Sequence, residues 1–214
     1  MHQPSAEPRP SIYYDYRVFS PWLPSDPSQQ ARKPVVIAGS GPAGMVTALE
    51  LARHGVASVV LTAELQFSQG SRAIVFTRRS MEILQQVGVA GRMSGTGLPW
   101  RHGNSFYRGQ RVFRMEAPHD ADERFHPMLN VQQQYMEEYL YEACAAHPLI
   151  DFRWGNKVTS VEQHDDHARI TVDTPAGEYA LEADWLVAAD GGRSGIRAAM
   201  NLQMEGASYE GAFV

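Results

Sequence analysis

The sequence predicts an α/β fold built around a parallel sheet, and three observations lead to this prediction. Residues 35–38 are a short apolar run, which is typical of a parallel strand buried on both faces. A glycine-rich turn, a helical pattern and another apolar strand follow this run directly. A second apolar run, residues 185–189, also leads straight into Asp190 and a glycine pair. Strands that alternate with helices in this way are the pattern of a parallel sheet.

The turn after the first strand, residues 39–44, has the spacing G-x-G-x-x-G. Gly39 suits the tight turn, Gly41 suits a close approach of the backbone to a pyrophosphate, and Gly44 suits close packing of helix on strand. The free N–H groups at the start of the following helix would face the phosphates, together with the positive end of the helix dipole. The turn therefore predicts a dinucleotide site.

The context of the turn supports this prediction. Residues 45–54 carry apolar side chains at helical spacing, Gly55 is placed to end that helix, and residues 58–61 form the next strand. A strand, turn, helix and strand within about 30 residues is the arrangement that such a motif requires. The alternative is a structural turn that binds no ligand.

The residue that would bind a ribose is less clearly defined. An acidic side chain is expected about 20 residues after the turn, at the end of the second strand. Thr62 occupies that place, and the nearest carboxylate is Glu64. The contact could be made by Glu64, by Thr62 or through water.

Composition and charge narrow the class of protein. The chain has 214 residues, 43% of them hydrophobic, and a net charge of −5, so we expect a globular protein without general attraction to nucleic acid or anionic membranes. Cys144 is the only cysteine, which excludes an internal disulfide and a thiolate metal cage, and we expect a buried thiol. His164 and His167 flank an acidic turn, and we expect no metal there. No secretory signal or membrane span is visible, so the expected location is the cytoplasm.

Residues 1–33 are expected to form an N-terminal arm, because prolines are frequent there and argue against a helix. Five aromatic residues between positions 13 and 22 would be unusual in a free tail. We therefore expect residues 12–23 to lie across the folded body. A partner-binding arm is the alternative.

The middle of the chain combines helices with a hairpin. Residues 78–87 and about 132–146 have helical patterns, and residues 106–113 are predicted to form two short strands around a glycine. Arg72, in the loop before the first of these helices, is either a surface charge or a ligand contact at the edge of the sheet. The three glutamines at 132–134 are either a polar helix start or a ligand contact.

The last third of the chain contains further strands. Residues 151–154 are a third candidate for the parallel sheet. Strand-like alternation at 157–162, 168–173 and 178–181 predicts a three-stranded antiparallel meander. Residues 185–189, predicted as a buried strand, run into Asp190 and Gly191. Asp190 could cap a helix that begins near Ser194 or face a ligand at the same sheet edge as the glycine turn.

Together the glycine turn, the loop at 71–73, the segment at 130–134 and the segment at 183–197 resemble the FAD-dependent aromatic hydroxylases. These are single-component flavin monooxygenases, typified by 4-hydroxybenzoate and 3-(3-hydroxyphenyl)propionate hydroxylases. The resemblance covers residues 35–214. It implies a Rossmann-like FAD-binding domain at 34–100 and 127–214, with the start of a substrate-domain sheet at 101–126.

The resemblance also implies which residues hold the cofactor and what the protein does. The candidate FAD-binding residues are Gly39, Gly41, Pro42, Ala43, Gly44, Thr62, Glu64, Arg72, Gln133, Asp190 and Gly191. The implied reaction is hydroxylation of a small phenolic or aromatic substrate with O₂ and NADH or NADPH, and a homodimer is possible. No catalytic side chain can be named. The family has a further Gly-Asp motif downstream, so we expect this chain to be an N-terminal portion of such an enzyme.

The resemblance leaves two alternatives open. A flavin reductase, epoxidase or halogenase could share the fold, because fold and cofactor do not determine the reaction. The chain could also be a catalytically inactive module that binds FAD or another dinucleotide.

Overall fold

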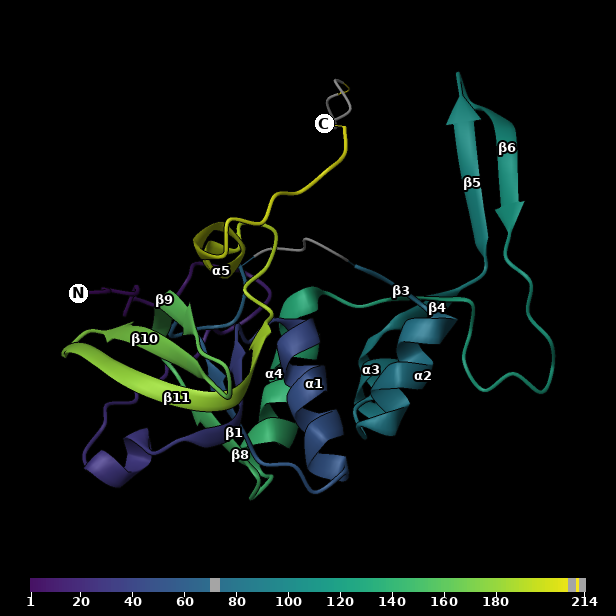
Figure 1. Cartoon of the computed structure of the whole chain (residues 1–214). Helices are drawn as coiled ribbons and strands as arrows, with labels where there is room; N and C mark the ends of the chain where they lie inside the picture. The colour runs from purple at the N-terminus through teal and green to yellow at the C-terminus, as the bar shows by residue number, and fades with distance from the viewer. Residues whose placement is uncertain (70–73, 208–210, 212–214) are drawn as a thin grey trace.

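The computed structural model describes residues 1–69, 74–207 and 211, and a six-stranded sheet forms its centre (Figure 1). The strand order is β8-β2-β1-β11-β10-β9. The first four of these strands are parallel, and β10 and β9 continue the sheet in antiparallel pairing. The strands are β1 (Lys33–Ala38), β2 (Ser58–Leu61), β8 (Ile150–Arg153), β9 (Lys157–Gln163), β10 (Ala168–Thr174) and β11 (Gly177–Ala188). The predicted α/β fold with a parallel sheet and an antiparallel meander is confirmed.

Both faces of the parallel part are covered. Val35 and Ile37 pack in one core with α1 (Pro42–Arg53) and α4 (Gln133–Ala145), whereas Val36 belongs to a second core with residues of β10 and β11. This division follows from the alternation of side chains along a strand. The two helices lie side by side on one face of the sheet (Figure 1).

Helix α1 matches its predicted face. Met45, Ala48, Leu49 and Ala52 are buried, and Gly55 has a φ of +76° directly beyond the helix. The helix begins at Pro42, three residues earlier than predicted, because proline is well suited to the first helical position. Cys144 of α4 is fully buried against this region, and burial raises the pKa of its thiol to about 12.

The prediction for the last strand was wrong in two respects. The third meander strand and residues 185–188 form one continuous strand, β11, which pairs with β10 up to Ala183 and with β1 from Ala183 to Ala188. Trp185, which was predicted to be buried, is 73% exposed. Trp185 lies beside Val35 in the β1–β11 pairing but outside the core that Val35 shares with α1 and α4, so apolar composition did not produce burial.

The N-terminal arm packs on the body, as predicted. Tyr16 and Phe19 are buried in a cluster with Leu65, Phe67 and Trp154, and the Phe19 ring stacks on the Trp154 ring at 4.2 Å between centroids. A short 3-10 helix, η1 (Pro27–Gln30), leads from the arm to β1.

Two smaller sheets are separate from the central sheet. Strands β3 (Val75–Thr77), β7 (Met128–Asn130) and β4 (Leu98–Trp100) form one of them, and β5 (His102–Tyr107) with β6 (Gln110–Glu116) forms the predicted hairpin. The hairpin projects away from the rest of the molecule (Figure 1). The sequence predicted neither β4 nor the helix α3 (Ala90–Thr96), which follows the expected helix α2 (Arg78–Gln86). Among the described residues, no helix has the length and apolar character needed to cross a membrane.

Candidate functional site

A cleft of about 930 Å³ opens at the carboxyl edge of the parallel strands. Its walls come from the segments that follow β1, β2, β8 and β11 and from the start of α4. This edge is where open α/β sheets bind ligands, and the volume lies in the ~300–1,000 Å³ range of cofactor and ligand sites. The lining includes Gly39, Gly41, Pro42, Ala43, Thr62, Glu64, Gln133, Asp190 and Gly191 from the candidate residues. The four segments that carry these candidate residues, far apart in the sequence, thus meet at one site.

Close packing requires glycine at two of the three glycine positions in the turn. Gly39 has a φ of +109°, and a Cβ atom there would lie 2.2 Å from the carbonyl oxygen of Ala189. A Cβ atom on Gly44 would lie 2.0 Å from the carbonyl oxygen of Gly39. Both positions exclude larger residues, since backbone atoms occupy the space. Gly44 is buried beneath the turn and is the one glycine of the motif outside the cleft lining.

Gly41 differs from the other two glycines. A Cβ atom there would meet nothing within 4 Å, and its φ of −67° is open to any residue. The protein itself therefore gives no reason for glycine at this position. Open space beside the first turn of α1, whose early N–H groups lack partners within the helix, fits a bound phosphate.

The end of β2 shows how the two candidate ribose contacts are placed. Thr62 is 4% exposed, and its backbone is bonded to Arg153 and Asn156. The Glu64 side chain is 53% exposed at the rim, where its Oε2 accepts a hydrogen bond of 2.7 Å from Nη2 of Arg9. Both residues line the cleft, and the carboxylate is the more accessible group. Which of them contacts a ribose stays a prediction.

A buried carboxylate organises the wall formed by α4. Glu137 is 4% exposed and accepts hydrogen bonds from the backbone and the hydroxyl of Ser68, at 2.7 and 2.8 Å. It also accepts one from Nε2 of Gln133 at 2.6 Å. Since the amide nitrogen of Gln133 is held in this way, its carbonyl oxygen is left as an acceptor for a ligand hydroxyl. Of the three glutamines, Gln132 is the N-cap, and Gln134 is 4% exposed beside it.

Asp190 fits both interpretations given to it. Its carboxylate accepts hydrogen bonds from the Ser194 hydroxyl at 2.6 Å and from the Ile196 N–H at 3.2 Å, which stabilises the start of α5 (Gly195–Ala199). The residue also lines the cleft, directly beside the glycine turn, and Gly191 follows it with a φ of +84°. The helix-capping role is therefore present at the edge of the cleft.

Several cleft residues were not predicted from the sequence. Arg9, Lys157 and Arg193 bring positive charge to the lining, which suits an anionic ligand, and Glu137 was read only as part of a helix. Arg9 and Glu137 reach the cleft through long-range packing that no local pattern reveals. The predicted site residue Arg72 lies outside the described residues. Within the described ranges, no group of three or more His, Cys, Asp and Glu side chains could hold a metal ion.

With this geometry established, the comparisons assign the family. A family model described as an FAD binding domain matches residues 32–214. The chain belongs to this family of FAD-binding domains. The match begins one residue before β1 and includes every parallel strand and the whole described cleft except Arg9.

Individual relatives identify the enzyme class that the chain resembles. The para-nitrophenol 4-monooxygenase of a Pseudomonas species is 30% identical over 182 residues, which cover 82% of this chain and 44% of that protein. The 3-(3-hydroxy-phenyl)propionate/3-hydroxycinnamic acid hydroxylase 2 of Burkholderia vietnamiensis is 32% identical, covering 83% of this chain and 33% of that protein. The resemblance to FAD-dependent aromatic monooxygenases is thereby confirmed.

Solved structures agree with these relatives. The p-nitrophenol 4-monooxygenase of Pseudomonas putida DLL-E4 superposes with a TM-score of 0.73 at 28% identity, covering 84% of this chain and 46% of that one. The flavin-dependent monooxygenase PieE, solved in complex with FAD and substrate, superposes with a TM-score of 0.74 at 28% identity, covering 82% of this chain and 33% of that one. The chain thus spans less than half the length of each of these four proteins.

Proposed function

We propose that this chain binds FAD in the described cleft and forms the cofactor-binding part of a monooxygenase that hydroxylates a small aromatic substrate. The observation that carries the proposal is the open space at Gly41, at the start of α1 and inside a cleft of about 930 Å³. The relatives support the substrate class, since p-nitrophenol and hydroxyphenylpropionate are both phenols. NADH or NADPH is proposed as the electron donor.

The proposed roles follow the geometry of the cleft. The backbone at Gly41, Pro42 and Ala43 would hold the pyrophosphate, Glu64 or Thr62 the adenosine ribose, and Gln133 the ribityl hydroxyls. Asp190 and Gly191 would lie along the cofactor beside the glycine turn. Bound FAD would supply the redox chemistry with O₂, while the chain binds and orients the cofactor and excludes water.

Two glycine variants test whether the cleft binds FAD. Gly41→Asp should fold like the wild type, because its φ is ordinary, the space is open, and aspartate is a favoured N-cap. Its carboxylate should repel the pyrophosphate and weaken FAD binding by about 100-fold or more. Titration with FAD, followed by quenching of flavin fluorescence, measures this. Equal binding by Gly41→Asp and wild type would contradict the proposed site.

Gly44→Ala is the matched variant for folding. Its new methyl group would meet the Gly39 carbonyl, so we expect a loss of about 1–3 kcal/mol in the free energy of unfolding. The pair separates a binding defect from a folding defect at two glycines of one motif.

Turnover is measured with the full-length gene product. Consumption of NADH or NADPH that a phenol stimulates, with a hydroxylated product, is the expected result. Consumption without hydroxylated product would favour a flavin reductase. FAD binding without any turnover would reduce the function to a cofactor-binding module.

A further inference from the structure

The first part of the N-terminal arm, residues 2–19, is bonded mainly to one segment of the cleft wall. Residues 63–69, which follow β2, accept or donate most of the polar contacts made by residues 2–19. This wall segment lines the cleft at Ala63, Glu64 and Gln66 to Gln69. The arm is therefore the outer support of the wall whose inner side faces the cleft.

The side-chain amide of Gln66 anchors the arm to the wall segment. It is 3% exposed, its Oε1 accepts a hydrogen bond from the Arg9 N–H at 2.9 Å, and its Nε2 donates to the carbonyls of Glu7 and Ser5 at 2.7 and 3.2 Å. A buried amide with its hydrogen-bonding groups satisfied is costly to disrupt. The hydrogen bonds of Gln66 therefore place residue 9 at a defined position on the rim of the cleft.

From this position, the Arg9 side chain extends into the cleft. Its guanidinium donates to the Phe67 carbonyl at 2.5 Å and to Oε2 of Glu64 at 2.7 Å. The Arg9 side chain is only 22% exposed, whereas that of Glu64 is 53% exposed. The less exposed arginine thus holds the more exposed carboxylate, and no described residue donates to the other oxygen of Glu64.

We infer that the arm is a working part of the cofactor site and that Arg9 is a positioning residue for Glu64. By fixing one carboxylate oxygen, Arg9 presents the other to the adenosine ribose and limits the rotamers that Glu64 would lose on binding. The inference rests on the proposed function, because it assumes FAD in the cleft. It assigns to the arm a contribution that the matched family region, residues 32–214, does not contain.

Separate probes for the two halves of FAD test this inference. Arg9→Ala should weaken binding of FAD and of ADP by about tenfold, the scale of a lost charged hydrogen bond, and should leave FMN within about twofold of wild type. Arg9→Lys keeps the charge but not the two-pronged geometry of the guanidinium. Its affinity for FAD and ADP should fall between those of wild type and Arg9→Ala. Arg32→Ala is the matched control, since Arg32 pairs with Asp166 and Asp184 outside the cleft.

A double-mutant cycle identifies the route of the effect. If Arg9 acts through Glu64, Arg9→Ala combined with Glu64→Gln should cost little more for ADP than Glu64→Gln alone. Additive losses would overturn the positioning role. Equal loss of ADP and FMN, unchanged binding, or tighter binding by Arg9→Ala would overturn it as well.

The outcomes also separate this inference from the proposed function. A wild-type chain that binds neither FAD nor ADP would overturn both. A wild-type chain that binds FAD, together with an Arg9→Ala variant that binds it equally well, would overturn only the inference.

Discussion

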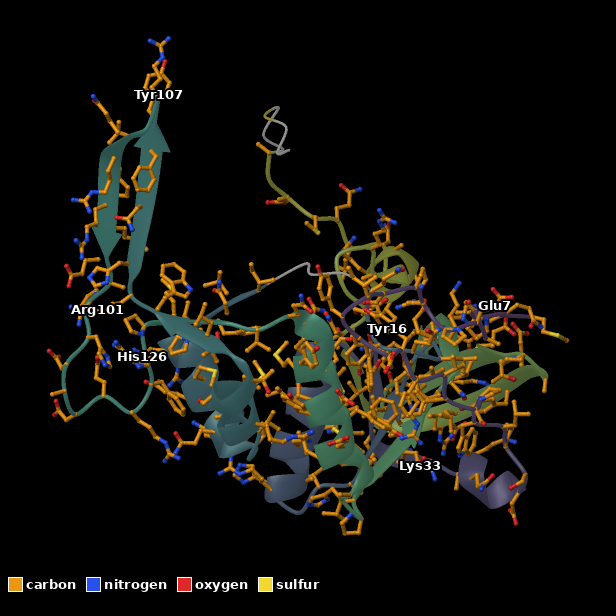
Figure 2. The ribbon with its side chains drawn as sticks, turned by 180° about the vertical axis from the view of Figure 1, so that it is seen from behind. Glu7, Tyr16, Lys33, Arg101, Tyr107 and His126 are labelled. Atoms are coloured by element: carbon orange, nitrogen blue, oxygen red, sulfur yellow. The ribbon has the colours of Figure 1, made fainter. Side chains whose placement is uncertain are left out.

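The N-terminal arm and the β5–β6 hairpin are both rich in aromatic side chains, and they differ in what those side chains contact. Tyr16 and Phe19 of the arm are each 7% exposed, whereas Tyr107 and Phe113 of the hairpin are 62% and 60% exposed. Figure 2 shows Tyr107 at the tip of the hairpin, away from the body, and Tyr16 within the body. The arm has no regular strand or helix before η1, yet it is the more deeply packed segment.

The difference teaches that secondary structure and burial are separate properties. The hairpin satisfies its backbone groups by pairing its own two strands, so its existence requires no core. The arm cannot do this and takes its partners from residues 63–69 and from Trp154. Two of its aromatic side chains, Tyr16 and Phe19, are buried in this contact.

The largest expected effect comes from matched phenylalanine truncations. Phe19→Ala removes a ring that stacks on Trp154 and touches Phe67 and Tyr141, so we expect a loss of about 3 kcal/mol in the free energy of unfolding. Phe113→Ala should change it by less than about 0.5 kcal/mol. Urea denaturation measures both. Equal losses for the two variants would refute the contrast between arm and hairpin.

A second matched pair of variants tests the wall segment on which the arm packs. Glu137→Ala would leave the Ser68 N–H and the Gln133 amide without their buried acceptor, and we expect a loss of about 2 kcal/mol. Glu116→Ala, at the base of the hairpin, removes a half-exposed pairing with Arg101 and should cost much less than Glu137→Ala, because solvent screens the pair. The same urea assay compares them, and a larger loss for Glu116→Ala would contradict the comparison.

Alkaline pH should lower the free energy of unfolding through the phenol of Tyr14, which lies in the arm. Burial, helped by the nearby charge of Glu138, raises the pKa of this phenol above its ordinary value of 10.0. Above pH 10 the folded chain therefore keeps a proton that the unfolded chain loses, so stability falls as pH rises. Tyr14→Phe removes this contribution and should show a shallower loss between pH 9 and 11 (roughly one unit either side of the ordinary value). Parallel curves for variant and wild type would disprove the role of Tyr14.

The smallest effect is expected at the turn of the hairpin. Arg108 has a φ of +46° and Gly109 one of +78°, which is the backbone that favours Asn-Gly. Arg108→Asn should stabilise the hairpin by roughly 0.5–1 kcal/mol, seen as slower hydrogen exchange of its amides. The urea midpoint of the whole chain should not move, because the hairpin is joined to no core. A shifted midpoint would show that the hairpin is coupled to the body.

The sequence by itself determined the features that depend on local sterics and periodicity. The strand at 35–38, the helix after it, the strand at 58–61 and the glycine turn each follow from short-range rules, and the structure has all of them. The hairpin around Gly109 belongs to the same class. These elements also located the edge of the sheet at which the cleft opens.

Only the tertiary structure decided what the chain brings to that edge from a distance. Arg9 is 55 residues from Glu64, and Glu137 is 69 residues from Ser68, so no periodic pattern connects either pair. The exposure of Trp185 was likewise decided at the tertiary level, because Trp185 lies beside Val35 in the sheet but outside the core that covers Val35. Local sterics are encoded in neighbouring residues, whereas contacts between distant segments exist only after the strands have chosen their order and register.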